Sequence, residues 1–120
     1  MQFTIEHGGG FTINGYRPGE IRVNGSRYRH SVIVTPHSCE PWDIHHPEEL
    51  RRQHFSAILG LEPDILLLGT GETQRFPEMR LYADVITLGI GVEVMHSAAA
   101  ARTFNLLVQE QRSVIAAIIV

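Results

Sequence analysis

The fold is decided by the stretch Ile65-Leu66-Leu67-Leu68-Gly69-Thr70-Gly71. An apolar run that ends at a glycine-rich turn is typical of a short strand covered on both faces. Two further strand-like runs follow at residues 92–95 and 114–120, and longer segments with helix-like spacing separate the three. Because parallel strands need a crossover between them, this β-α-β-α-β order predicts a parallel unit with right-handed crossovers and helices on both faces.

Each connecting segment carries helix signals. Residues 47–59 open with a proline and two glutamates, which suit the first turn of a helix, and Gly60 is expected to end it. A second helix is expected to begin near Pro77. A third is expected over residues 98–111, because Ser97 is a favourable N-cap and four alanines follow it.

The first third of the chain alternates apolar and polar residues, which is the period of half-buried strands. The apolar positions are Phe3, Ile5, Phe11, Ile13, Ile21 and Val23. Turn residues at Asn14-Gly15, Pro18-Gly19 and Asn24-Gly25 interrupt or follow these positions, and the Asn-Gly pairs favour two-residue hairpin turns. A longer strand is expected over residues 28–35, followed by an irregular segment at 36–46. Since such turns join antiparallel strands, we predict an α/β fold: a mixed sheet with N-terminal antiparallel hairpins and a C-terminal parallel unit.

The composition restricts the function. With 120 residues, 43% of them hydrophobic and 19% charged, the chain is expected to form a single domain over residues 1–120. The net charge of -3 gives none of the basic excess typical of proteins that bind nucleic acid. All ten basic residues are arginine, which excludes a lysine Schiff base and phosphate binding of the Walker A type.

The sequence also gives an expectation about compartment. The single cysteine, Cys39, excludes an intrachain disulfide. The first residues show no basic start followed by an apolar stretch, so no secretory signal is expected. The uncharged run at residues 113–120 is far shorter than the roughly 20 residues that a membrane-spanning helix needs. We therefore expect a cytoplasmic protein without a membrane span.

The first candidate site is the turn Gly69-Thr70-Gly71. Ligands in open α/β sheets bind beyond the carboxyl ends of strands, and glycines there let a ligand approach the backbone. Thr70 offers a hydroxyl and Arg75 a cation to an anionic ligand. A dinucleotide fingerprint would need glycine at position 74, which is Gln74, so no dinucleotide is expected. The alternative is that the glycines form a tight turn and permit close packing of helix on sheet.

The second candidate is the polar stripe of the last helix. Arg102 and Asn105 lie three residues apart on one face of this helix. We expect them to border a groove shared with the glycine-rich turn; the alternative is a solvent-exposed face. The predicted ligand or partner site therefore consists of Gly69, Thr70, Gly71, Arg75, Arg102 and Asn105. No catalytic residue is assigned.

Residues with metal-ligating atoms occur in one irregular segment. They are His37, Cys39, His45 and His46. Their spacing matches no known ligand pattern, so no metal and no cofactor is predicted. We expect them to pack this segment against the sheet with Trp42 as the anchor. The alternative is that Trp42 is an exposed contact for a protein partner.

Several short segments together resemble a known family. They are Leu67-Leu68-Gly69-Thr70-Gly71, Gly91-Val92-Glu93-Val94-Met95, the pattern Ser97, Ala100, Phe104, Asn105, Leu107, and Glu110-x-Arg112. In order and spacing they are similar to the small α/β domain family of mitochondrial complex I assembly factor 3 and its uncharacterised bacterial and archaeal relatives. The resemblance covers residues 10–119. It implies a central mixed sheet and no established enzymatic activity, and for the mitochondrial member a role in assembling respiratory complex I with a partner assembly factor.

Three hypotheses follow. The first is a non-catalytic binding or assembly module that contacts a protein partner. The second is a domain or enzyme that holds a small anionic ligand at the glycine-rich turn, with no bond broken or formed that the sequence identifies. The third is self-association into a homo-oligomer through the C-terminal strand, which would invite pairing if it lay at a sheet edge.

Overall fold

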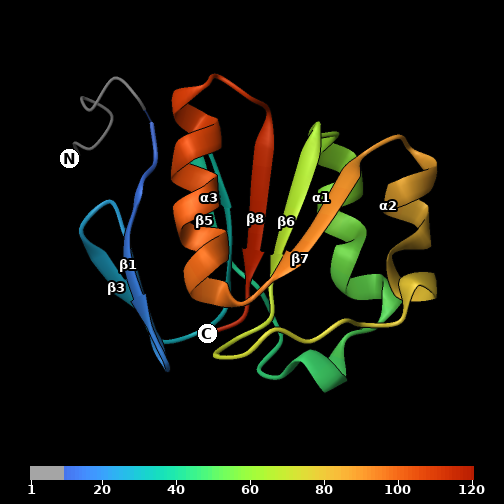
Figure 1. Ribbon diagram of the computed structural model, residues 1–120, viewed down its shortest axis with the longest axis horizontal. Coiled ribbons are helices and arrows are strands. Elements are labelled where there is room, and N and C mark those ends of the chain that lie inside the picture. Colours follow the sequence, from blue (N-terminus) through green and yellow to red (C-terminus); the bar gives the residue numbers. More distant parts are fainter. Residues whose placement is uncertain (1–9) are drawn as a thin grey trace.

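The three predicted parallel strands form one side of a five-stranded mixed sheet (Figure 1). In the computed structural model, which describes residues 10–120, they are β6 (Ile65–Gly69), β7 (Gly91–Met95) and β8 (Val114–Ile118). β6 runs parallel to both β7 and β8. The predicted strand positions Phe3 and Ile5 lie outside the described residues.

Two antiparallel strands complete this sheet. β4 (Val32–Thr35) pairs with β8, and β5 (Ser38–Pro41) pairs with β4. The resulting order is β5-β4-β8-β6-β7. The C-terminal strand β8 is therefore central, so the condition for self-association through it, a place at the sheet edge, is not met.

Alternate residues of the central strands feed two separate cores. On β6, Leu66 and Leu68 face one core and Leu67 faces the other. Both faces of the sheet are thus apolar, which explains why these strands read as unbroken apolar runs.

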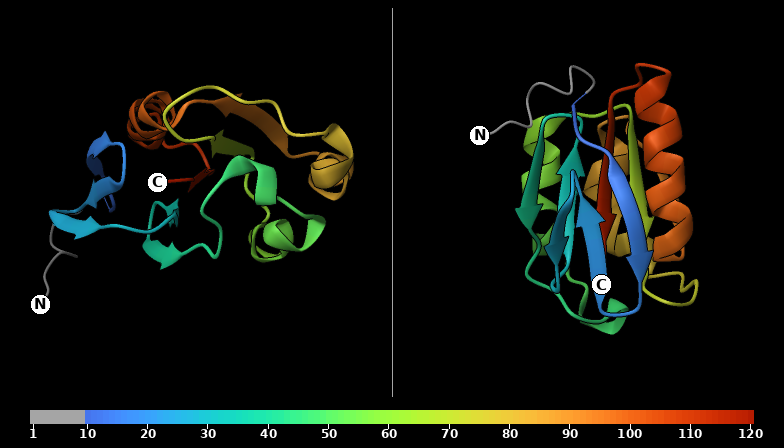
Figure 2. Two further views of the ribbon diagram at one scale, coloured as in Figure 1. Left: turned by 90° about the horizontal axis from the view of Figure 1, so that it is seen from below. Right: turned by 90° about the vertical axis from the view of Figure 1, so that its left-hand side faces the viewer.

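Different elements cover the two faces, as seen along the sheet in Figure 2. One face carries α3 (Ser97–Gln109) and a three-stranded antiparallel sheet of β1 (Ile13–Arg17), β2 (Glu20–Val23) and β3 (Ser26–Tyr28). The other face carries α1 (Ser56–Leu61) and α2 (Ala83–Thr87) with their short 3₁₀ turns. The predicted α/β fold, with helices on both faces and N-terminal hairpins, is confirmed. The hairpin turn predicted at Asn14-Gly15 is wrong, because these residues lie within β1 at an irregularity in its pairing with β2; the chain turns at Pro18-Gly19 and Asn24-Gly25.

The predicted helix at residues 47–59 is broken. A 3₁₀ turn at Pro47–Glu49 is followed by extended backbone, a second 3₁₀ turn at Arg52–Phe55, and only then α1. Leu50 and Phe55 are both fully buried. Five residues apart in a continuous helix, they would point about 140° away from each other, and the break lets both reach one core. The helix predicted from Pro77 is likewise a 3₁₀ turn, Met79–Tyr82, that leads into the short α2.

The predicted strand at residues 28–35 is two strands in different sheets. β3 ends at Tyr28 and β4 begins at Val32, with buried Ser31 between them. The carbonyl of Ser31 accepts from the Trp42 amide, and its hydroxyl accepts from the Val120 amide. These contacts turn the chain from one sheet into the other. The segment predicted to be irregular contains β5.

No helix within residues 10–120 is both long enough and apolar enough to cross a membrane.

Candidate functional site

The turn after β6 is held by its own hydrogen bonds. The buried Thr70 hydroxyl donates to the Thr73 carbonyl at 2.8 Å and accepts from the Arg75 amide at 3.0 Å. The Thr70 amide donates to the Met95 carbonyl. The Thr70 side chain therefore fixes the loop.

Ser97 connects this turn to α3 and β8. Its buried hydroxyl accepts from the Gly71 amide at 2.8 Å and donates to the Ile119 carbonyl at 2.6 Å, while its own amide donates to the Gly71 carbonyl. A Cβ at Gly69 would lie 3.0 Å from the Ser97 hydroxyl and 3.2 Å from the Ala100 side chain. Glycine at this position therefore permits α3 to approach the strand closely.

The predicted N-cap of α3 is wrong by one residue. His96 is the N-cap, because its Nδ1 accepts from the Ala99 amide at 3.2 Å. Ser97 is the first helical residue, and its hydroxyl is used in the contacts with Gly71 and Ile119.

A pocket of about 330 Å³ lies beyond the carboxyl ends of β6 and β8. This is where open α/β sheets place their ligands. It brings Thr70, Gly71 and Arg75 together with His45 and His46. The remaining lining residues are Pro47, Glu48, Glu72, Thr73, Ile119 and Val120. The sequence analysis groups His45 and His46 with His37 and Cys39. The structure places them beside Thr70, Gly71 and Arg75 instead, because residues 45–48 lie next to the glycine-rich loop in space.

The pocket rim carries charges of both signs. The Arg75 guanidinium lies 3.6 Å from the Glu48 carboxylate, and both side chains are largely exposed. The His45 amide donates to the Glu49 carboxylate at 3.0 Å, and this hydrogen bond is the main reason that the pKa of Glu49 is lowered. Within residues 10–120, the amides of Glu72 and Thr73 have no hydrogen-bond partner.

Tyr16 of β1 also lies near this loop. Burial raises the pKa of its hydroxyl, and the nearby Glu72 carboxylate raises this pKa further. The three-stranded sheet therefore reaches the same end of the molecule as the glycine-rich turn.

Arg102 and Asn105 do not line the pocket. The Asn105 carboxamide forms two hydrogen bonds with the backbone of Ile13, accepting from the amide at 2.9 Å and donating to the carbonyl at 2.8 Å. Ser97 marks the end of α3 beside the loop, and about 12 Å of helix separate it from Asn105. Asn105 therefore attaches the three-stranded sheet to α3, and Arg102 is exposed on the same helix.

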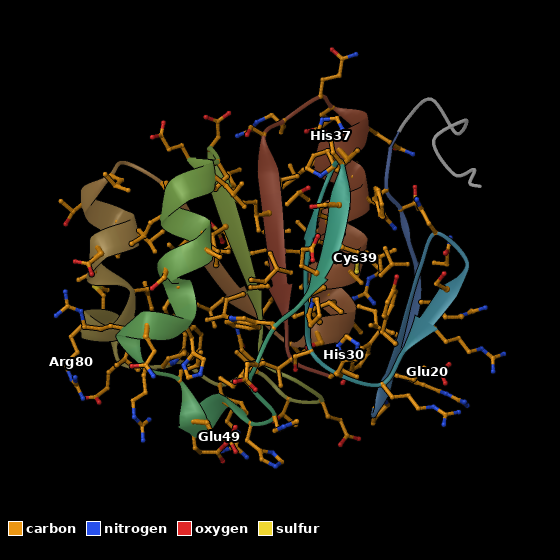
Figure 3. The ribbon with its side chains drawn as sticks, turned by 180° about the vertical axis from the view of Figure 1, so that it is seen from behind. Glu20, His30, His37, Cys39, Glu49 and Arg80 are labelled. Atoms are coloured by element: carbon orange, nitrogen blue, oxygen red, sulfur yellow. The ribbon has the colours of Figure 1, made fainter. Side chains whose placement is uncertain are left out.

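Of the four residues with metal-ligating atoms named from the sequence, His45 and His46 line the pocket and His37 and Cys39 do not. His37 and Glu49 lie at opposite ends of the molecule, and Cys39 lies on β5 (Figure 3). No group of three or more His, Cys, Asp or Glu side chains within residues 10–120 is placed to hold a metal ion. Burial raises the pKa of the Cys39 thiol to about 11.

Trp42 is a core residue. It is buried, its indole nitrogen donates to the His54 carbonyl at 2.8 Å, and its ring meets Phe55 edge to face. It therefore anchors its segment to the core and is not an exposed partner contact.

Comparison with known families identifies the group. Residues 13–119 match the family described as "Protein of unknown function (DUF498/DUF598)". The chain belongs to this family.

Two relatives illustrate its range. The chain is 32% identical over 101 residues to the "13 kDa major membrane protein" of Francisella tularensis, covering 82% of each chain. It is 34% identical over 110 residues to the human "NADH dehydrogenase [ubiquinone] 1 alpha subcomplex assembly factor 3". This match covers 89% of the present chain but 59% of the human protein.

Solved structures share the fold. A Bordetella parapertussis protein superposes with a TM-score of 0.85 at 32% identity, covering 91% of this chain and 94% of that one. A Bartonella henselae protein, described as an outer membrane protein, superposes with a TM-score of 0.83 at 28% identity. The match covers 92% of this chain and 94% of that one.

The expectation of a cytoplasmic protein is wrong. It rested on the absence of a signal and of a long apolar run, whereas relatives of nearly the same length are named membrane proteins. Neither feature of the sequence reports on attachment of a folded domain to a membrane or to its proteins.

Proposed function

We propose that the protein is a non-catalytic binding module that serves in the assembly of a membrane-associated protein complex, and that its partner contacts the loop between β6 and α2. The observation that carries the proposal is the exposure of two large apolar side chains on this loop. Phe76 is 73% exposed and Met79 is 65% exposed. Aromatic and methionine side chains are enriched at the centres of protein interfaces.

The loop is anchored, which supports a role in recognition. Thr70 holds its first turn, and the Gln74 side chain donates to the Val94 carbonyl at 3.0 Å. Phe76 follows two residues later and points outward from this fixed backbone. A contact residue that is already held in place loses less conformational entropy when it binds.

The relatives support an assembly role at the level of the family. Several are named as assembly factors of NADH dehydrogenase, so a subunit or another assembly factor of that complex is the proposed partner. A binding role also suits the site, because the hydroxyls of Thr70 and Ser97 are both engaged in hydrogen bonds that hold the fold.

Photocrosslinking tests this proposal. A benzophenone amino acid is placed at Phe76 and, as a matched control, at Leu106, which is 54% exposed on α3. In cells that make the protein, we expect one discrete crosslink from position 76, to a subunit or assembly factor of NADH dehydrogenase, and none from position 106. Equal crosslinking from both positions, or none from position 76, contradicts the proposal.

A second candidate function is binding of a small anion in the pocket beside the loop. It is favoured by the unpartnered amides of Glu72 and Thr73 next to Arg75. Arg102 and Asn105 take no part in it. A ligand at 100 times its dissociation constant would add about 2.7 kcal/mol of stability, so a thermal-shift screen of phosphorylated metabolites would detect it. Loss of the shift in Arg75→Ala is expected; the same shift in this variant contradicts the candidate.

A further inference from the structure

The three-stranded sheet concentrates the positive charge of the protein. Residues 13–30 contain four of the ten arginines but only one of the thirteen acidic residues. The chain as a whole has a net charge of -3, so this basic region stands out from an acidic remainder. A local excess of this kind produces a field that attracts anions.

The arginines converge on the outer face of the sheet. Arg17 on β1, Arg22 on β2 and Arg27 on β3 line a pocket of about 350 Å³. Its other lining residues are Gly15, Tyr16 and Glu20. None of these six residues lines the pocket beside the glycine-rich turn or belongs to the loop that carries Phe76.

Glu20 organises two of the arginines. It is only 8% exposed, and its two carboxylate oxygens lie 3.5 Å from the Arg17 guanidinium and 4.0 Å from the Arg27 guanidinium. Figure 3 shows Glu20 on the side of the molecule that the three-stranded sheet forms. The pocket thus contains three guanidinium groups and one carboxylate, which leaves a net charge of about +2.

Arg22 has no acidic partner within residues 10–120. It lies directly opposite Arg27 in the register of β2 and β3. Like charges at opposed positions of an antiparallel pair destabilise a sheet. On its other side Arg22 faces Gly15, where a Cβ would lie 3.0 Å from its guanidinium nitrogen. The sheet therefore holds two facing arginines at a cost to its own stability and leaves room for one of them to lie flat.

We propose that this face of the three-stranded sheet binds a phosphate monoester, with Arg22 and Arg27 holding the phosphate and Glu20 positioning Arg17 and Arg27. A phosphate monoester carries close to two negative charges at neutral pH, which matches the net charge of the pocket, whereas a single carboxylate carries one. Planar guanidinium groups bind phosphate oxygens in pairs. The group could belong to a soluble metabolite or to a lipid headgroup.

Titration with two phosphate sources tests the proposal and distinguishes them. The probes are glycerol 3-phosphate in solution and phosphatidylcholine vesicles with or without phosphatidic acid, with sodium chloride at matched ionic strength as the control. Binding of glycerol 3-phosphate supports a soluble ligand. Sedimentation only with vesicles that contain phosphatidic acid supports a lipid headgroup. Binding of neither, or an equal response to chloride, overturns the proposal.

Two arginine variants separate binding from folding. Arg22→Gln is expected to weaken phosphate binding at least tenfold and to leave the melting temperature of the free protein equal or higher, because it removes the repulsion from Arg27. Arg102→Gln, on exposed α3 surface, is the matched control and should bind as the wild type does. A lower melting temperature with unchanged affinity in Arg22→Gln would show a purely structural arginine and overturn the proposal.

The wild-type protein gives an independent readout if Arg22→Gln fails to fold. Amide resonances of Gly15, Arg22 and Arg27 are expected to shift with added glycerol 3-phosphate or with short-chain phosphatidic acid. Shifts confined to residues outside β1, β2 and β3 would contradict the assignment of the site.

Discussion

At the scale of single residues, the structure depends on polar groups that join segments far apart in the sequence. Ser97 is the clearest case. One hydroxyl and one amide connect the turn after β6, the start of α3 and the end of β8. The sequence identified this serine as a helix cap, and its neighbour His96 has that role.

Ser97→Ala is expected to lower the free energy of unfolding by about 2 to 6 kcal/mol. The substitution leaves the Gly71 amide and the Ile119 carbonyl buried without a partner, and each such group costs about 1 to 3 kcal/mol. Urea denaturation measures the change. Ser113→Ala, at an exposed serine, is the control and should change stability by less than about 0.5 kcal/mol. Equal stability of both variants would contradict the connecting role of Ser97.

Cys39 is expected to react slowly. Burial raises the pKa of its thiol to about 11, against an ordinary value of roughly 8.5, so the folded protein holds little thiolate at pH 8. Alkylation by iodoacetamide at pH 8 should be at least tenfold slower in the folded protein than in urea. Equal rates would show that the thiol is neither buried nor perturbed.

The same pKa shift gives a pH dependence of stability. Between about pH 8.5 and about 11 the unfolded chain has lost the thiol proton and the folded chain still holds it, so the free energy of unfolding falls as the pH rises. Below pH 8.5 this contribution is constant. In this alkaline window the free energy of unfolding of the wild type should fall relative to that of Cys39→Ala, which has no thiol. Below about pH 8.5 the difference between the two proteins should stay constant, and denaturation curves measured over the pH range check both statements.

At the scale of elements, α3 ends in a strained cap. The Gln111 amide donates to the Val108 carbonyl and the Arg112 amide to the Leu107 carbonyl, which is the Schellman arrangement. The arrangement places Gln111 at a φ of 60°, where glycine is usual because a side chain is crowded.

Gln111→Gly is therefore expected to stabilise the protein by about 0.5 to 1 kcal/mol. Gln109→Gly, two residues earlier and still helical, is the matched control and should destabilise it by about 1 kcal/mol. Thermal and urea denaturation report both values. A loss of stability in Gln111→Gly would mean that the Gln111 side chain makes a contribution larger than the strain.

The elements also show what sequence patterns can predict. The parallel unit was predictable because its strands are apolar on both faces. Each strand is therefore an unbroken apolar run that can be recognised from its own residues alone. The break after Pro47–Glu49 was not, because it arises from the need to bury Leu50 and Phe55 in one core. β5 was missed because its residues are partly exposed and it ends at Pro41.

Only the part of the candidate site that lies in one continuous segment was predictable from the sequence. The glycine-rich turn is a local signal, and the structure places it at a pocket. Its neighbours are not local: His45 and His46 approach it from another segment, whereas Asn105 is drawn away by its two hydrogen bonds with Ile13. Positive charge on the three-stranded sheet was hidden by the overall net charge of -3.

At the scale of the whole molecule, one sheet separates two cores. Phe104 lies in the core between α3, the five-stranded sheet and the three-stranded sheet, and is fully buried. Removing its ring would loosen the three-stranded sheet as well as α3, because both depend on this core.

Phe104→Ala is expected to cost about 3 to 5 kcal/mol of the free energy of unfolding, through lost burial and the cavity left behind. Leu106→Ala on the exposed side of the same helix should cost less than about 1 kcal/mol. Hydrogen exchange of the β1 and β2 amides should accelerate in Phe104→Ala. Unchanged exchange in these strands would show that the three-stranded sheet is stable without this core.

The central position of β8 has a consequence for how the protein is made. β4 pairs with β5 and β8, and β6 pairs with β7 and β8, so no backbone ladder joins the two halves of the five-stranded sheet until β8 arrives. A nascent chain therefore carries two unconnected pairs with open edges until synthesis passes residue 118. Closure of the sheet is therefore a late event, and unpaired strand edges of this kind favour association with other chains until it occurs.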